Sequence, residues 1–333
     1  MADPPNNPHD AYFRHVLAKP ANAAGELQAV LPPAVSARVD WGALELQPCS
    51  FVTPELRSRF SDLLFRTRLA GHDAFIYVLV EHQSQPHPLM PFRMLEYMVR
   101  IWNHYIDDHP KTDTLPVVIP MVVYASPNGR RWNKPTELAD LISIDPGGRT
   151  ALGDYLPNLR FLLDDLAAVD VPALLTRKLT PEARVMLVLL KRAQGNRHLD
   201  KDLTLLLDDF GAMLAASGGK AELVCALTYI LIVGETSESD LGSVIGQLGP
   251  QAREAIMTTA DRLRAEGEAR GEARGEAKSE AKWRAQALVE QLSEKFGTLT
   301  AETVATVRSA TPERLRVWSA RILTASSLDE VFQ

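Results

Sequence analysis

Residues 60–83 decide the fold, and they read FSDLLFRTRLAGHDAFIYVLVEHQ. Residues 60–69 and 74–83 are rich in β-branched and aromatic side chains and are separated by a short polar turn, so they predict two consecutive β-strands. Both faces of the second strand are largely apolar, which is typical of a central strand that is buried on both sides. This buried strand nevertheless ends in a carboxylate and an amide, Glu81 and Gln83.

The turn between the two strands sets which side chains face each other. A two-residue loop of Gly71 and His72, with glycine first, fits a type II′ turn. In that register Asp62 lies directly opposite Glu81, and Gln83 lies two residues further along on the same face. A register shifted by one residue would move Asp62 to the other face of the sheet. The predicted hairpin therefore gathers three polar groups on one face.

Two carboxylates this close together on an apolar face indicate a metal ion. Their charges repel, so one of them would take up a proton unless a cation lies between them. Mg²⁺ prefers carboxylate oxygens and keeps several waters, one of which can attack a phosphoryl group. Asp62 and Glu81 are therefore the candidate metal ligands, and Gln83 is the candidate group that orients the attacking water. The alternative is that the two acids are solvated strand ends or partners of nearby arginines.

Two histidines and one more acid are considered as additional members of the site. His82 points to the opposite face of its strand, which favours a structural role. Residues 9–31 predict two short helices that break near Pro20. His9 and Asp10 lie at the start of the first of these helices and could join the site from there.

The segments around the hairpin complete an α/β core. A short strand is predicted over residues 44–47, a helix over 91–105, and a β-branched strand, LPVVIPMVVYA, over 115–125. The order is then helix, three strands, helix, strand. From residue 157 onward the pattern becomes helical and contains no catalytic constellation, which predicts an all-α extension. Its helices are expected over residues 157–169, 181–195, 200–216 and 221–234.

The C-terminal part begins with a low-complexity tract over residues 264–282 that contains EGEARGEARGEAKSEAK. On a helix its glutamates and its basic residues would form two opposed stripes, and its glycines would weaken the helix. We interpret the tract as a solvated linker. The alternative is that the opposed stripes bring two copies of the chain together. Two or three short helices follow over residues 288–332, with Trp318 and Phe332 as expected core residues.

Composition narrows the class of protein. The formal net charge of −6 does not indicate a nucleic-acid binder, so any affinity for phosphates has to come from a local basic patch. The two cysteines, Cys49 and Cys225, are far apart, which indicates a reducing compartment and excludes a zinc finger. No signal peptide is expected, and the most apolar stretches are shorter than the ~20 residues that a membrane-spanning helix needs. We expect a cytoplasmic protein with no membrane partner.

Several segments, in the right order, closely resemble one known family. They are PHDAYFRHVL (8–17), SFVTPELRSRFSDLLF (50–65), YVLVEHQSQPHPLMPFRMLEYMVRIW (77–102) and LPVVIPMVVY (115–124). This part of the chain resembles the recombination-promoting nuclease family, also called the YhgA-like family of transposases. Residues 286–332 resemble the short helical domain of unknown function that often follows, usually after a Gly-Glu-Ala-rich tract.

The resemblance implies a PD-(D/E)XK restriction-endonuclease-like fold and divalent-metal cleavage of DNA, with a link to recombination or mobile elements. In the family pattern the aspartate of the second strand matches Asp62, and the Glu-x-Gln of the third strand matches Glu81 and Gln83. The wider superfamily has lysine where this chain has Gln83, which can hydrogen-bond but carries no charge. This departure puts the turnover rate in doubt more than metal binding. The superfamily often adds an acid from the first helix, for which Glu26 is the nearest candidate.

The pattern along the chain predicts four parts, and four basic residues are candidates for DNA contact, with a solvated surface as the alternative for each of them. We expect a nuclease-like domain over residues 1–156, a helical extension over 157–258, a charged linker helix over 259–285 and a small helical domain over 286–333. The side chains expected to contact DNA phosphates flank the strands, and they fix position without reading sequence. They are Arg93, Arg130, Arg131 and Lys134.

Three functional hypotheses follow. The leading one is a Mg²⁺-dependent DNA endonuclease of low sequence specificity. The second is a catalytically weak nuclease fold that serves as a DNA-binding or assembly module, which the Gln83 departure and the acidic net charge favour. The third is a protein-interaction scaffold that forms a homo-oligomer through residues 260–333.

Overall fold

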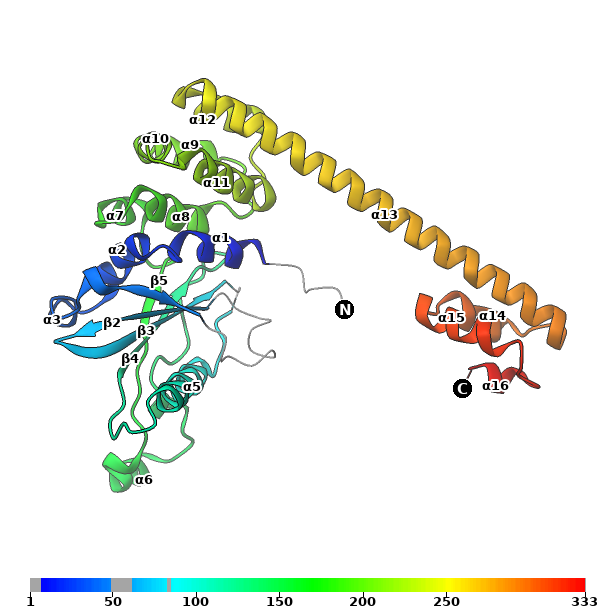
Figure 1. Cartoon of the computed structure of the whole chain (residues 1–333), viewed down its shortest axis with the longest axis horizontal. Helices are drawn as coiled ribbons and strands as arrows, with labels where there is room; N and C mark the ends of the chain where they lie inside the picture. The colour runs from blue at the N-terminus through cyan, green and yellow to red at the C-terminus, as the bar shows by residue number, and fades with distance from the viewer. Residues whose placement is uncertain (1–6, 49–61, 83–84, 333) are drawn as a thin grey trace. The chain divides into compact units, whose positions relative to one another are not determined.

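The computed structural model describes residues 7–48, 62–82 and 85–332 (Figure 1). The chain divides into two compact units, Met1–Ala260 and Asp261–Gln333. The helices of the first unit, which begin and end as follows, are α1 Pro8–Leu17, α2 Pro20–Val30, α3 Pro33–Ser36, α5 Met90–Asp108, α6 Pro146–Leu152, α7 Val171–Thr176, α8 Pro181–Arg192, α9 Leu199–Thr204, α10 Leu207–Ala215, α11 Gly219–Val233 and α12 Glu238–Ile245. Helix α13 (Pro250–Phe296) belongs to both units, and α14 (Ala301–Arg308), α15 (Pro312–Arg321) and α16 (Leu328–Phe332) belong to the second.

A mixed five-stranded sheet forms the centre of the first unit. Its spatial order is β1 (Glu45–Gln47), β2 (Asp62–Leu69), β3 (His72–Glu81), β4 (Val117–Tyr124) and β5 (Leu162–Asp165). Strands β1, β2 and β3 are antiparallel, whereas β4 and β5 run parallel to β3. The predicted α/β class is confirmed, as are the four strands expected from the sequence and the break between the first two helices near Pro20.

The fifth strand corrects the sequence analysis. A helix predicted over residues 157–169 is wrong, because residues 162–165 form β5 and pair with β4 from Met121 to Tyr124. A run of only three apolar residues before two aspartates carries no decisive period, so neither helix nor strand is specified locally. The outer edge of β4 decides the outcome, since its backbone N–H and C=O groups need partners. The helical extension therefore begins only after this strand, with α7.

The hairpin register also differs from the prediction, by two residues. Asp62 lies opposite Leu79 rather than Glu81, and Leu69 lies opposite His72. The loop is Ala70-Gly71, and both residues have positive φ, 51° and 88°. Two positive φ values match a type I′ turn, whose twist follows that of the strands. Because the shift is an even number of residues, every side chain stays on its predicted face.

Each face of the sheet is covered by different helices. Helix α5 covers one face, and its Tyr97 and Met94 pack on Tyr77 and Leu79 of β3. The opposite face packs against α1, α2 and the helices that follow β5, which together form one continuous core. Side chains from either side of residue 157 contribute to this core, so the predicted boundary between a nuclease-like domain and a helical extension stays a prediction.

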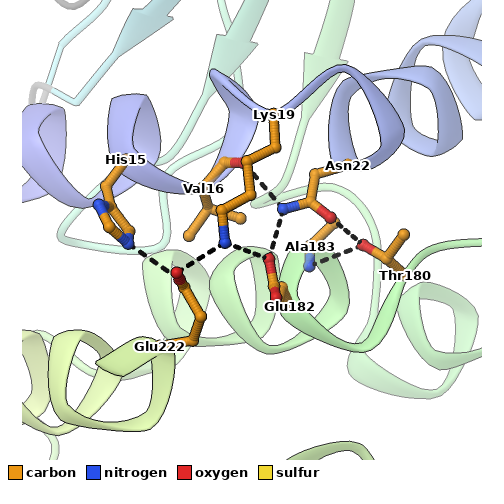
Figure 2. A network of polar contacts seen from close by, with 8 residues as sticks. All are labelled: His15, Val16, Lys19, Asn22, Thr180, Glu182, Ala183 and Glu222. Atoms are coloured by element: carbon orange, nitrogen blue, oxygen red, sulfur yellow. Dashed lines mark hydrogen bonds and ion pairs between the residues drawn. The ribbon is translucent and has the colours of Figure 1, made fainter. Parts of the chain in front are cut away.

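A polar network fixes the end of α1 against α8 and α11 (Figure 2). The Lys19 ammonium contacts Glu182 Oε2 at 2.8 Å and Glu222 Oε1 at 2.7 Å. His15 Nε2 lies 2.9 Å from Glu222 Oε2, and Asn22 Nδ2 donates to Glu182 Oε2 at 2.8 Å. One short segment of chain is thereby tied to two helices that lie more than 150 positions away. The network holds α1, which enters the candidate site at its other end.

The second unit has a core of its own. The last turns of α13 supply Ala285, Leu288 and Leu292 to this core, and α15 supplies Trp318. The Trp318 and Phe332 rings meet edge to face with their centroids 4.8 Å apart, which confirms both as core residues. The charged tract lies within α13. Among the described residues, no helix combines the length and apolarity needed to span a membrane.

Candidate active site

Asp62 opens β2 on the face that α5 covers, and only 5% of the residue is exposed. Burial raises the pKa of this carboxyl to about 7, because removal from water disfavours the charged form. The Tyr77 hydroxyl and the positive charges of Arg93 and Arg14 oppose this rise, while the negative charge of Asp10 adds to it. Asp62 is therefore a buried acid that titrates near neutral pH.

Glu81 closes β3 on the same face and is fully buried. Its backbone is held, since the Glu81 carbonyl accepts a hydrogen bond from the Ala125 amide at 3.1 Å. Neither carboxylate oxygen has a hydrogen-bond partner among the residues that the structure describes. The nearest cation in the described part of the chain is Arg93, whose Nη1 lies 3.8 Å from Oε2. Burial, which Arg93 opposes and Asp10 reinforces, raises the pKa of Glu81 to about 7.

Asp10 is the acid that links the two strand carboxylates. It lies in the first turn of α1, and burial raises its pKa to about 6 against the opposing hydrogen bond from Asn7. Its negative charge raises the pKa of both Asp62 and Glu81. Three carboxyl groups from α1, β2 and β3 thus share one electrostatic environment at one end of the sheet. Over the described residues, however, no three His, Cys, Asp or Glu side chains are placed to hold one ion together.

The structure assigns Glu26 to a different cluster. Glu26 lies in α2, on the face of the sheet opposite Asp62, and both its oxygens accept from Arg177 Nη1 at 3.1 and 3.2 Å. The same guanidinium bonds Asp164 of β5 at 2.7 and 2.8 Å. Glu26 therefore belongs to a buried ion cluster, and the acid that the first helices bring toward Asp62 is Asp10.

The remaining predicted residues are placed as follows. Gln83 lies outside the described residues. Arg93 is 8% exposed and is turned toward Glu81, so in this conformation it faces the acids and not the surface. Arg130 and Arg131 are exposed and Lys134 is half-buried, all on the loop that follows β4. Hydrogen bonds anchor that loop, for example from the Trp132 amide to Asp165 Oδ2 at 2.8 Å.

Two tyrosines beside the acids were not singled out from the sequence. Tyr77 and Tyr97 stack with their ring centroids 4.6 Å apart, and the charge of Asp62 raises the pKa of both hydroxyls in addition to the larger effect of burial. Tyr77 shares the period-two alternation of Glu81, so its face was predictable. Tyr97 lies on α5 one helical turn beyond Arg93, and only the packing of α5 on the sheet brings it to the site.

The raised pKa values predict how stability depends on pH. In the unfolded chain these carboxyls titrate near 3.8 and 4.5, whereas in the folded chain Asp62 and Glu81 titrate at about 7. Between these values the folded state binds more protons, so the free energy of unfolding falls as the pH rises from about 4 to about 7 and levels off above that. Each group costs up to about 1.4 kcal/mol per pH unit in this window. Urea unfolding in chelator at several pH values measures it.

The Asp62→Asn variant is the control for this pH dependence. Its amide cannot ionise, so the variant is expected to be more stable than the wild type at pH 8, by about 4 kcal/mol for a folded pKa of about 7 against 3.8 in the unfolded chain. At pH 4.5 the two proteins should differ little, because Asp62 is then protonated in the folded state. Parallel pH profiles for the two proteins would show that Asp62 does not titrate near neutral pH.

The chain is an α/β protein whose mixed β-sheet carries buried acids at the ends of two adjacent strands. Comparison with known proteins gives its family. Residues 7–219 match the family model described as "Putative transposase, YhgA-like", and the chain belongs to this family. It is 31% identical to recombination-promoting nuclease RpnD of Escherichia coli O157:H7, over 78% of this chain and 94% of that protein.

Two relatives from Escherichia coli strain K12 have contrasting names. Recombination-promoting nuclease RpnA is 29% identical over 79% of this chain and 85% of its own length. Inactive recombination-promoting nuclease-like protein RpnE is 28% identical over 79% of this chain and 83% of its own length. No solved structure matches the chain significantly. The family therefore contains members named as nucleases and members named as inactive.

Proposed function

We propose that the chain is a divalent-metal-dependent DNA endonuclease of the PD-(D/E)XK type, with low sequence specificity and a link to recombination. One observation carries the proposal: two buried acids, Asp62 and Glu81, end adjacent strands on one face, and both titrate near neutral pH. Such a perturbation is typical of functional sites. The names of two relatives support the same activity.

The site fits a divalent cation in two respects. Glu81 is a buried carboxylate without a hydrogen bond among the described residues, and a hard cation is a natural partner for such a group. Asp62, Glu81 and the nearby Asp10 supply only oxygen ligands, which suit Mg²⁺ and leave several positions to water. Asp62 and Glu81 would hold the ion. When bound, Mg²⁺ supplies a polarised phosphoryl oxygen and a more acidic water.

The chain's own residues would then divide the remaining tasks. Gln83 would accept a hydrogen bond from the attacking water and orient it, as an uncharged group can. Asp10, with a pKa of about 6, is largely ionised at pH 7.5 and can take up a proton near the two strand acids. Arg93 keeps a positive charge beside Glu81. The exposed Arg130 and Arg131 would contact the phosphate backbone without reading sequence.

A second candidate function is a nuclease fold that binds DNA or assembles without cutting it. The observation that favours it is that Arg93 Nη1 lies 3.8 Å from Glu81 Oε2 and serves as the counter-charge of this acid in place of a metal ion. The relative RpnE, which is named as an inactive nuclease-like protein, supports the absence of cleavage in this candidate. Metal-independent DNA binding without cleavage distinguishes this candidate. An assembly role further predicts a homo-oligomer that is lost when residues 261–333 are removed.

Supercoiled plasmid tests the leading proposal. The purified wild type is expected to convert it to the nicked form in Mg²⁺ and to leave it intact in chelator, because the two acids repel unless a cation neutralises them. Gel electrophoresis over a time course measures the rate, and an identically purified Asp62→Asn preparation is the blank for contaminating nuclease. A folded wild type that binds plasmid equally in Mg²⁺ and in chelator but never cuts it would overturn the proposal in favour of the binding module.

A further inference from the structure

Three aromatic side chains connect the helical part of the first unit to the end of β3. His82 directly follows Glu81, and its ring stacks on that of His9 with centroids 3.4 Å apart and an interplanar angle of 8°. His9 Nδ1 and the Tyr229 hydroxyl of α11 are hydrogen-bonded at 2.8 Å. The Tyr229 ring in turn stacks on Tyr12 with centroids 4.6 Å apart. His9 and Tyr229 are both buried.

The stack joins two of the three segments that carry site acids, α1 and β3. Asp10 follows His9 in α1, and Glu81 precedes His82 in β3. The two stacked rings therefore hold together the backbones that present Asp10 and Glu81. Burial lowers the pKa of His9 to about 4, so the ring is neutral at pH 7 and its bond to Tyr229 is a neutral hydrogen bond.

The Glu81 side chain has few polar contacts of its own. Its oxygens have no hydrogen-bond partner among the described residues, and Arg93 Nη1 lies 3.8 Å from Oε2, so the position of the backbone largely decides where the carboxylate lies. The Ala125 amide holds that backbone on the side of β4. The histidine stack holds the next residue on the face opposite Glu81. A group that must coordinate or transfer protons works only when such surrounding contacts keep it in place.

We propose that Tyr229 is a positioning residue for the candidate active site: through His9 and His82 it sets the placement of Asp10 and Glu81 for a divalent cation. This role rests on the proposed function, and it makes α11 a part of the site although the helix contributes no ligand. The expected consequence is that loss of one hydroxyl on α11 weakens cation binding and cleavage together, without disturbing the fold.

The Tyr229→Phe variant tests this role against the Tyr12→Phe control, which removes a hydroxyl from the ring stacked on Tyr229 but leaves the bond to His9. Affinity for Mn²⁺, measured by electron paramagnetic resonance, reports on the site without any need for turnover. Tyr229→Phe is expected to weaken Mn²⁺ binding and to slow plasmid nicking by about tenfold each, the lower end of the effect of a residue that orients metal ligands. Tyr12→Phe should match the wild type in both measurements.

A double-mutant cycle with His9→Phe separates positioning from general stability. If Tyr229 acts through His9, Tyr229→Phe lowers neither affinity nor rate further in the His9→Phe background. A purely structural role is recognised when Tyr229→Phe lowers the melting temperature but leaves Mn²⁺ affinity and nicking rate unchanged below it, and this result overturns the positioning role alone. A wild type that neither binds Mn²⁺ nor nicks plasmid overturns the proposed function and this role with it.

Discussion

Asp62→Asn is expected to lower the rate of Mg²⁺-dependent plasmid nicking by about 10²-fold or more. A bound cation stabilises the developing charge on the phosphoryl group by several kcal/mol, and each 1.4 kcal/mol is about tenfold in rate. The amide keeps the size of the carboxylate but loses its charge, so the cation would be held by Glu81 alone among the strand acids. Because Asp62 has a pKa of about 7, a neutral group at this position is compatible with the fold.

The matched control for this variant is Asp73→Asn on the same hairpin. Asp73 is half-exposed and pairs with Arg66 at 3.2 Å, far along β3 from Glu81. It carries the same charge as Asp62 but takes no part in the buried site, so its variant should nick plasmid at the wild-type rate. Initial rates at saturating Mg²⁺, with circular dichroism to show that both variants are folded, give the comparison. Equal rates for Asp62→Asn and the wild type would refute the assignment of Asp62.

The face on which the site residues lie could be predicted from the sequence, but their pairing could not. Alternation along β3 places Tyr77 and Glu81 on one face whatever the partner strand does. The pairing depends on whether the turn uses Gly71 as its first or its second residue. Glycine permits both positions. The positive φ of Ala70, 51°, could not be predicted from the sequence, because alanine rarely adopts such a value. The predicted register placed Asp62 opposite Glu81, whereas the structure places it two residues away, opposite Leu79. Because the difference is an even number of residues, Asp62 is on the side of α5 in both registers.

Local sequence patterns could not predict which acid of the first two helices reaches the site. Asp10 and Glu26 both lie in short helices before the sheet, and nothing in their immediate neighbours ranks them. Glu26 lies outside the site and pairs with Arg177, which is 151 positions later in the chain. Asp10 reaches the site because α1 is fixed by the His9 stack at one end and by the Lys19 network at the other. Both facts depend on contacts across the whole first unit.

The fifth strand was missed for a related reason. Residues 162–165 alone would suit a helix or a strand, and the choice is made by the exposed backbone of β4 and by Arg177, which bonds Asp164 on the strand. A carboxylate inside a buried strand is unfavourable unless a cation meets it. The sequence gives no sign that a particular arginine 13 positions later will do so.

Because the buried carboxylate of Asp164 depends on Arg177, we expect Arg177→Met to have the largest effect on stability. Its guanidinium is the shared partner of Glu26 and Asp164, which are 1% and 4% exposed. Burial and the nearby charge of Asp164 raise the pKa of Glu26 well above its usual range. Burial also acts to raise the pKa of Asp164, but the hydrogen bonds from Arg177 and Glu26 and the charge of Arg177 together lower it. The Arg177 guanidinium is therefore the counter-charge of this buried pair of acids.

Removing the guanidinium leaves buried carboxyl groups without their counter-charge, which costs about 3–5 kcal/mol of unfolding free energy. Urea unfolding at pH 7 measures this loss, and Arg197→Met, which breaks an exposed pair with Glu235, should cost no more than about 1 kcal/mol. The triple variant Glu26→Gln, Asp164→Asn, Arg177→Met should recover much of the loss, because it leaves no charge unpaired. If Arg177→Met cost no more than Arg197→Met, the cluster would not hold β5 and α2 together, and the edge of β4 alone would have to account for the fifth strand.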